Sequence, residues 1–284
     1  MNYRHAFHAG NHADVLKHLI LLALLDALKR KDAPFFVLDT HAGRGRYELA
    51  GAAAEKTGEA RDGILRLGHP KLEREARKKP AISVYLDAIA QDLDEGFYPG
   101  SPLLAARAMR PQDRLACCEL QPDEASALKQ LFAHDARVAV HQRDGYGAIK
   151  ALLPPKEKRG LVLIDPPYEA QLGEFDTVLD ALKTGLSRWP QGIFALWYPI
   201  KQRRAILPFL RSASRLPAKS AWIAELHVRA PELPLRMNGS GMLVLNPPWK
   251  TDEEIAPTLP LLAKTLGEPD AGFVFQWLKQ ETGA

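Results

Sequence analysis

The sequence predicts an α/β fold, built on a mostly parallel sheet that ends in an antiparallel hairpin. Short apolar runs alternate with segments of helical periodicity, which is the pattern of parallel strands joined by helical crossovers. Several of these runs end in an acidic or glycine residue, at the sheet edge where open α/β folds place their ligands. The strands are expected at residues 35–38, 114–118, 137–140, 161–164 and 193–197, and the hairpin at 221–228 and 242–245.

One domain is expected to span residues 1–284, because 46% hydrophobic and 25% charged residues are typical of a globular chain. From residue 50 to 97 the pattern changes to charged helical sequence, interrupted at Pro80, and we interpret this stretch as a helical insertion. Its basic run at 71–79 is open to two interpretations, a solvated helix face or part of an RNA-binding surface.

Composition limits the function only weakly. The formal charge of +4 and the pI near 9.0 favour a polyanionic partner, but the 38 Lys and Arg residues barely outnumber the 34 Asp and Glu residues. The two cysteines, Cys117 and Cys118, are neighbours in a predicted strand and point to opposite faces. They are therefore unsuited to an intramolecular disulfide, which fits a reducing cytoplasm.

Export and membrane signals are not visible in the sequence, and neither is a Cys/His spacing typical of a metal site. The most apolar stretch, residues 18–27, contains Asp26 and is too short to cross a bilayer. We therefore predict a cytoplasmic protein with no metal and no membrane partner.

Two helix starts are predicted from capping residues. Asn11 is a good N-cap for a helix that runs to about Lys31, and Ser101 is expected to cap a helix after a proline-rich turn. The arm before the first helix carries Tyr3 and Arg4, and a ring beside a guanidinium commonly holds an unstacked base. The single histidines of this arm are more often structural.

A glycine loop follows the first predicted strand. Gly43 and Gly45 allow the backbone to turn tightly and to approach a ligand closely. The loop lacks the third glycine of the dinucleotide-binding fingerprint, and the acidic residue Asp39 precedes the loop. This arrangement argues against a standard NAD site.

The run Asp165-Pro-Pro-Tyr168 ends the fourth predicted strand and is suited to one kind of chemistry. A carboxylate and a backbone carbonyl can accept the two hydrogens of an exocyclic amino group, while an aromatic ring stacks on the planar base that carries it. The alternative is a strand that ends in a proline turn, with Asp165 as a helix cap. A second such run, Asn246-Pro-Pro-Trp249, is expected to be structural, because we place it toward an edge of the sheet, where proline is tolerated.

Taken in chain order, these motifs resemble those of class I S-adenosylmethionine-dependent methyltransferases that act on amino nitrogen. The series consists of Asp39-x-x-x-Gly43-x-Gly45, Glu119, Asp144-Gly145 and Asp165-Pro-Pro-Tyr168. More closely, the opening at residues 3–18 and the runs at 38–43, 98–102, 163–168 and 195–199 resemble the RlmJ family, bacterial 23S rRNA adenine N6-methyltransferases. The resemblance runs nearly from end to end.

The resemblance implies a Rossmann-like methyltransferase sheet, S-adenosylmethionine as cofactor and 23S rRNA as partner, with adenine 2030 as the target base. It further implies protein-free rRNA or an early assembly particle as the substrate. We also expect a monomer, because nothing in the mechanism requires a second subunit. The implied catalytic residues are Asp165, Pro166 and Tyr168; the implied cofactor-binding residues are His18, His41, Gly43, Ser101, Glu119, Asp144, Gly145 and Asp165; the implied contacts to substrate RNA are Tyr3, Arg4 and His5.

Three other functions remain open at this point. The same amino-methylation motif would serve an adenine in DNA or a protein amide. A protein with a vestigial cofactor pocket could act as a non-catalytic rRNA-binding assembly factor. An NAD oxidoreductase is the weakest alternative, because of the glycine loop described above.

Overall fold

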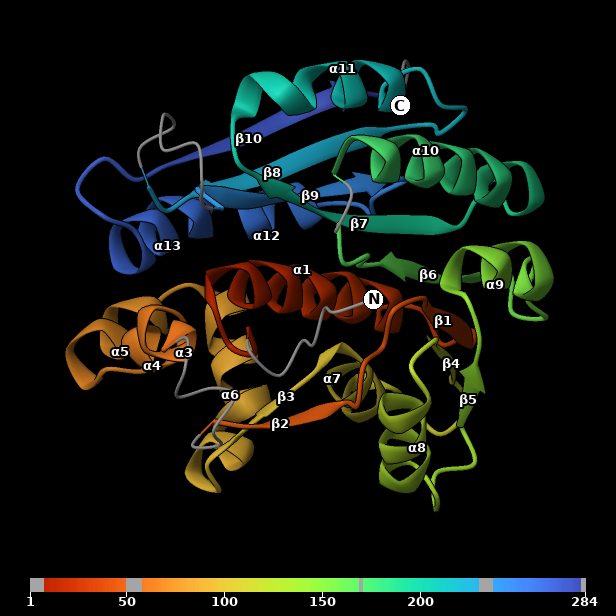
Figure 1. Cartoon of the computed structure of the whole chain (residues 1–284), viewed down its shortest axis with the longest axis horizontal. Coiled ribbons are helices and arrows are strands. Elements are labelled where there is room, and N and C mark those ends of the chain that lie inside the picture. Colours follow the sequence, from red (N-terminus) through yellow and green to blue (C-terminus); the bar gives the residue numbers. More distant parts are fainter. Residues whose placement is uncertain (1–7, 50–57, 169–170, 230–236, 282–284) are drawn as a thin grey trace.

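An eight-stranded sheet runs through the described part of this computed structural model, which covers residues 8–49, 58–168, 171–229 and 237–281 (Figure 1). Five neighbouring strands pair in parallel, and the other three alternate in direction. The order is β10 (Gly272–Lys279), β8 (Ala221–His227), β9 (Gly239–Leu245), β7 (Ile193–Ile200), β6 (Arg159–Ile164), β1 (Phe35–Asp39), β4 (Arg114–Glu119) and β5 (Val138–Gln142).

The five predicted parallel strands and the antiparallel pairing of β8 with β9 are confirmed. Two features differ from the sequence prediction. β9 lies between β7 and β8, so it is an interior strand and not the edge strand that we expected. β10 pairs with β8 as an additional strand. Its apolar residues point to both faces without a clear period, and this explains why the alternation pattern does not predict it.

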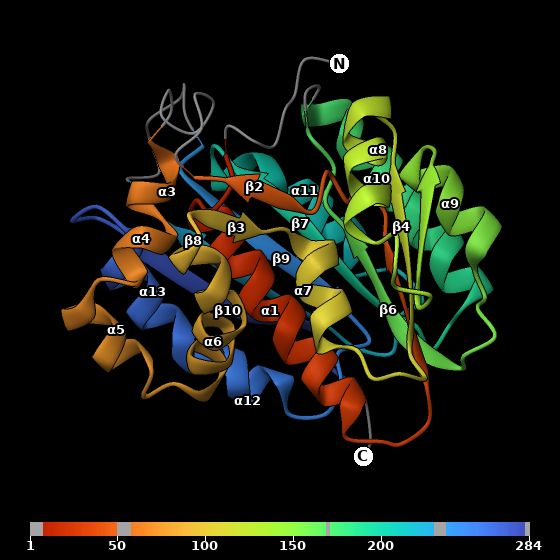
Figure 2. The same cartoon turned by 90° about the horizontal axis from the view of Figure 1, so that it is seen from below.

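Helices cover both faces of the sheet and make two separate cores (Figures 1 and 2). Cys117 belongs to one core and Cys118 to the other, so the predicted opposite orientation of the two free cysteines is confirmed. One face carries α9 (Gly145–Leu152), α10 (Gln171–Arg188) and α11 (Arg203–Ala213); the other carries α1 (His12–Lys29), α7 (Ser101–Ala108), α8 (Pro122–Leu131), α12 (Thr251–Ile255), η2 (Ala256–Thr258) and α13 (Leu259–Leu266).

Helix α1 is buried along most of its surface, because it lies between the sheet and the helices of its own layer. The predicted cap is confirmed: the Asn11 side chain accepts hydrogen bonds from the backbone N–H groups of Ala13 and Asp14. None of the helices in the described residues has the length and apolar composition that a bilayer-spanning segment needs.

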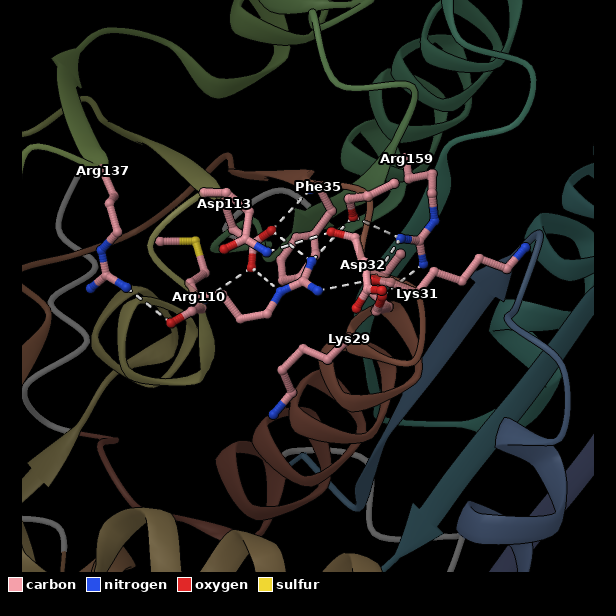
Figure 3. Close-up of polar contacts among 12 residues, drawn as sticks. Lys29, Lys31, Asp32, Phe35, Arg110, Asp113, Arg137 and Arg159 are labelled. Atoms are coloured by element: carbon pink, nitrogen blue, oxygen red, sulfur yellow. Dashed lines mark hydrogen bonds and ion pairs between the residues drawn. The ribbon is translucent and has the colours of Figure 1, made fainter.

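The carbonyl end of α1 is anchored at the edge of the sheet opposite Asp165 (Figure 3). Arg159 donates to the carbonyl of Leu28 at 2.7 Å, and Arg110 donates to the carbonyl of Lys31 at 2.9 Å. Cationic side chains commonly satisfy the free carbonyls at this end of a helix. The start of β6 and the loop that leads into β4 are thereby tied to the end of α1.

The predicted insertion is helical over its described residues and closes on a two-stranded stem, β2 (Arg46–Glu48) with β3 (Phe97–Pro99). Its longest helix packs against α1 and contributes to the same core. In its basic run, Arg77 pairs with Glu73 at 2.7 Å and with Asp87 at 2.6 Å, which favours the interpretation as a solvated helix face. The helices are α3 (Glu59–Asp62), α4 (Ile64–Leu67), α5 (Pro70–Ala76) and α6 (Pro80–Asp94).

Candidate active site

A cavity of about 950 Å³, part of it open to solvent, lies where β1, β4 and β6 end. Parallel strands bring their carboxyl ends to the same edge of a sheet, so motifs that are far apart in the sequence meet there. All eight residues predicted to bind a cofactor line this cavity: His18, His41, Gly43, Ser101, Glu119, Asp144, Gly145 and Asp165.

The glycine loop forms one wall of the cavity. Gly43 has a φ of +60°, and a Cβ there would come within 2.0 Å of the hydroxyl oxygen of Tyr47. A larger residue would therefore be strained and would also collide with its neighbour. Arg44, between the two glycines, pairs through two hydrogen bonds with Glu124, which also lines the cavity.

Glu119, at the end of β4, is held by two backbone donors. Its carboxylate accepts hydrogen bonds from the N–H of Gly43 at 2.9 Å and from the N–H of Gln121 at 2.7 Å. Burial raises the pKa of the Glu119 carboxyl above its usual range, although these hydrogen bonds oppose the change. A carboxylate has about four lone-pair sites, so two backbone donors leave acceptor capacity for a pair of hydroxyls.

Ser101 has a different role from the predicted helix cap. The helix begins at Ser101 itself, the capping position belongs to Gly100, and the Ser101 hydroxyl donates to the Asp39 carboxylate at 2.6 Å. The buried carboxylate competes successfully for the hydroxyl, because a charged acceptor makes a stronger hydrogen bond. Burial raises the pKa of Asp39 to about 6.

Two histidines that line the cavity pack against aromatic rings. His18 is fully buried, stacks on the ring of Tyr98 and lies 2.7 Å from the hydroxyl of Tyr98 through Nδ1. His41 meets the ring of Tyr146 edge to face. Burial lowers the pKa of His41 to about 4, so this imidazole is neutral at physiological pH.

Asp144 and Gly145 start helix α9 at the edge of the cavity. The Asp144 side chain caps the helix and accepts from the N–H of Gly147 at 2.6 Å. Gly145 lies so close to Thr40 that a Cβ on Gly145 would come within 2.1 Å of the carbonyl oxygen of Thr40. Glycine is thus the residue that lets the two strand ends approach each other here.

A buried ion-paired cluster, which the sequence reasoning missed, holds Asp165. The Lys17 ammonium lies 2.8 Å from the Asp14 carboxylate and 2.5 Å from that of Asp165, and its side chain is only 4% exposed. Burial alone would lower the pKa of Lys17, but the two carboxylates outweigh burial and raise it. A lysine in the middle of an apolar helix, three residues after an aspartate, is the sequence signal for this cluster.

We call this first cavity the cofactor-side cavity, because the residues predicted to bind a cofactor line it. The Asp-Pro-Pro-Tyr turn separates it from a second, larger hollow. This acceptor cleft, as we name it, encloses about 1580 Å³ including open space and shares Lys17, Asp165 and Pro167 with the first cavity. Pro166 is buried between the two shared turn residues. Tyr168 also lines the cleft; its φ is +47°, and its hydroxyl donates to the carbonyl of Trp197 at 3.0 Å.

The second proline run is structural, as predicted, although not for the reason expected. Because β9 is antiparallel to β7, Asn246 emerges at the edge of the sheet opposite Asp165. Its amide donates to the carbonyls of Pro190 and Gly192, and its oxygen accepts from the N–H of Lys219. The direction of the strand, and not an edge position, removes Asn246 from the site.

The remaining predicted contacts, Tyr3, Arg4 and His5, lie outside the described residues. Within the described residues, no group of three His, Cys, Asp or Glu side chains is arranged to hold a metal ion.

Together, the fold and the cavity define a class I, Rossmann-like methyltransferase that uses S-adenosylmethionine. The residues present fit this cofactor, because a carboxylate with spare acceptor capacity (Glu119), a close glycine backbone (Gly43) and the hydroxyl-bearing Ser101 line one cavity. A family model described as "Ribosomal RNA large subunit methyltransferase D, RlmJ" matches residues 32–279, and the chain belongs to that family.

Individual relatives match nearly the whole chain in sequence. The chain is 40% identical to Ribosomal RNA large subunit methyltransferase J of Haemophilus influenzae and 39% identical to that of Escherichia coli, in both cases over 99% of this chain and 100% of the relative. It is also similar to a crystal structure of a Legionella pneumophila protein, with a TM-score of 0.82 and 36% identity over 95% of this chain and 98% of the other.

Proposed function

We propose that the protein methylates the N6 atom of an adenine in 23S rRNA, adenine 2030 by the family resemblance, with S-adenosylmethionine as the methyl donor. The relatives named above are ribosomal RNA large subunit methyltransferases, which supports rRNA as the substrate. One structural observation carries the proposal: Asp165 lies where the cofactor-side cavity and the acceptor cleft meet.

In the cofactor-side cavity, Glu119 would accept the two ribose hydroxyls, and Asp144 with Gly145 would hold the adenine end. His18, His41 and Ser101 would line the methionine end. When bound, the cofactor supplies an electrophilic methyl group on a positively charged sulfur.

On the acceptor side, the protein has to orient a poor nucleophile, because the N6 lone pair of adenine is delocalised into the ring. Asp165 and the Pro166 carbonyl would accept the two N6 hydrogens and so favour a pyramidal nitrogen whose lone pair faces the methyl group. Lys17 holds the Asp165 carboxylate in place. Asp165 or a nearby water then takes the proton, and positioning and local electrostatics supply most of the acceleration.

The base has to leave its stack to reach the turn, which costs least in a loop or single strand. Tyr168 would stack on the base, and Tyr3, Arg4 and His5 would contact the RNA. We further propose that the enzyme acts as a cytoplasmic monomer on protein-free 23S rRNA or on an early assembly particle.

The test is methyl transfer from labelled S-adenosylmethionine to a protein-free 23S rRNA transcript, followed by nuclease digestion and mass spectrometry of the nucleosides. We expect N6-methyladenosine from the wild type. Asp165→Ala should keep cofactor binding, measured by calorimetry, and lose turnover. Asp180→Ala, an exposed carboxylate on α10, is the matched control and should keep both properties.

Three outcomes would contradict the proposal in different ways. Normal turnover by Asp165→Ala would remove Asp165 from the chemistry. Transfer to DNA or to a protein amide in parallel assays, with none to rRNA, would replace the substrate. Tight, salt-sensitive rRNA binding without S-adenosylmethionine binding would indicate a non-catalytic assembly factor.

A further inference from the structure

The acceptor cleft has walls of opposite charge. The ends of β7 and β8 contribute Lys201 and Arg229, while helix α3 of the insertion contributes Glu59 and Asp62. All four residues line the same cleft as Asp165. An anionic strand that enters the cleft is therefore attracted to one wall and repelled by the other.

A single buried residue holds the backbone of the cationic wall in place. Asn238 donates through its side chain to the carbonyl of Lys201 at 2.7 Å and through its backbone N–H to the carbonyl of Ile200 at 2.8 Å. The carbonyl of Asn238 accepts from the N–H groups of Val228 at 2.8 Å and Arg229 at 3.1 Å. Positions 201 and 229, at the ends of two strands, are thus fixed on either side of Asn238, because β9 lies between β7 and β8.

The cations on this wall are available for an external anion. Lys201 is exposed, and within the described residues no carboxylate pairs with its ammonium group. Arg229 pairs through Nε with Glu268 at 3.0 Å and donates from Nη1 to the carbonyl of Met237 at 3.1 Å, contacts that hold the guanidinium at the rim. Glu268 is itself 56% exposed, so solvent screens this pair.

The opposite wall of the acceptor cleft carries two acidic side chains, Glu59 and Asp62. Glu59 is engaged by the side chains of His8 and Asn11, whereas Asp62 is exposed at the end of α3. The hydrogen bonds from His8 and Asn11 lower the pKa of Glu59 although burial opposes them, so it stays a carboxylate. On this side of the cleft, phosphate groups would meet the exposed carboxylate of Asp62, while Glu59 is already paired with His8.

We propose that the RNA backbone crosses the cleft over the ends of β7 and β8, with Lys201 and Arg229 each contacting a phosphate beside the target nucleotide, and that it avoids the wall formed by the insertion. This inference rests on the proposed function and assigns the phosphate-binding residues of the same site. Asp165 lines the same cleft as Lys201 and Arg229, so the base and the flanking phosphates of one strand would occupy a single continuous space.

The experiment measures binding of a fluorescently labelled single-stranded RNA, 20 adenosines long, by anisotropy between 50 and 200 mM salt. Each lost phosphate contact should reduce the slope of log K against log salt by about 0.7. Lys201→Gln and Arg229→Gln are each expected to weaken binding about eightfold at 50 mM salt and about threefold at 200 mM. Arg229→Lys should recover most of the slope, because it keeps the charge, which a purely structural role would not predict.

Two further variants complete the test. Lys158→Gln removes an exposed lysine just before β6, at the opposite edge of the sheet, and should leave the slope and affinity unchanged. Asp62→Asn should tighten binding about twofold at 50 mM salt, because one repelling charge is lost.

The inference is overturned if Lys201→Gln and Arg229→Gln behave like Lys158→Gln, or if the wild type shows no salt-dependent RNA binding. Methyl transfer to 23S rRNA by the wild type is measured separately. If the wild type methylates rRNA but Lys201→Gln and Arg229→Gln keep the full salt slope, the inference is refuted and the proposed function stands.

Discussion

Lys17 is the residue whose replacement tests most directly how the acceptor carboxylate is held. Lys17→Met keeps a long, unbranched side chain and removes the charge that Asp14 and Asp165 share. The three side chains are 4%, 2% and 14% exposed, so solvent screens little of their interaction. Removing one partner of a buried ion pair leaves an uncompensated charge and typically costs about 3–5 kcal/mol.

We therefore expect Lys17→Met to lower the free energy of unfolding by about 3–5 kcal/mol, measured by urea unfolding with tryptophan fluorescence. Lys29→Met is the matched control, because Lys29 lies on the same helix in a solvent-exposed pair with Asp26 at 3.3 Å. That pair should contribute about 0.5 kcal/mol or less.

A double variant separates loss of charge from loss of packing. Asp14→Asn combined with Lys17→Met removes one of the two negative charges that Lys17→Met deprives of the lysine cation, so it should be at least about 1 kcal/mol more stable than Lys17→Met alone. If Lys17→Met costs no more than Lys29→Met, or if the effects of Asp14→Asn and Lys17→Met simply add, the cluster does not hold Asp165 electrostatically.

Two other replacements test groups near and far from the cofactor. Burial raises the pKa of Asp39 to about 6, so the folded protein binds a proton that the unfolded chain has lost, and stability falls as the pH rises from about 4 to about 6. At pH 8, Asp39→Asn should therefore have a free energy of unfolding about 3 kcal/mol higher, and a Tm about 5 °C higher, than the wild type. At pH 4.5 the difference should be small, and an equal gain in stability at both pH values would contradict this reasoning. Asn246→Ala removes three hydrogen bonds and should lower the free energy of unfolding, measured in urea, by about 2–4 kcal/mol. The Kd for S-adenosylmethionine should not change. Lost cofactor binding at unchanged stability would instead place the second proline run in the site.

Much of the candidate site was predictable because its motifs obey local rules. The glycines at 43 and 145 stand where a side chain would strike a neighbour, and such positions are marked in the sequence by the residue itself. The order of strand, acidic residue and helix then brings the residues predicted to bind the cofactor to one edge of the sheet. For this reason the predicted residues line one cavity although more than 100 positions separate some of them.

Other features depended on contacts between distant segments. Ser101 looked like a helix cap, but the Asp39 carboxylate, 62 positions away, takes its hydroxyl. Lys17 was not singled out in the sequence, and its partner Asp165 lies 148 positions further along. No local periodicity carries information about such pairs, because they form only when α7 packs beside the end of β1 and α1 beside the end of β6.

By itself, the sequence determined the parallel α/β sheet, the helical insertion and the motif residues at the strand ends, since periodicity, capping and the steric demands of glycine act over a few residues. The tertiary structure alone gave the reason why Asp165, and not Asn246, faces the cavity. Asp165 and Asn246 end similar apolar strands, but β9 runs antiparallel to β7 and delivers Asn246 to the opposite edge. Strand direction is set by the packing of the whole sheet, and that packing also placed Lys17 against Asp165 between the two cavities.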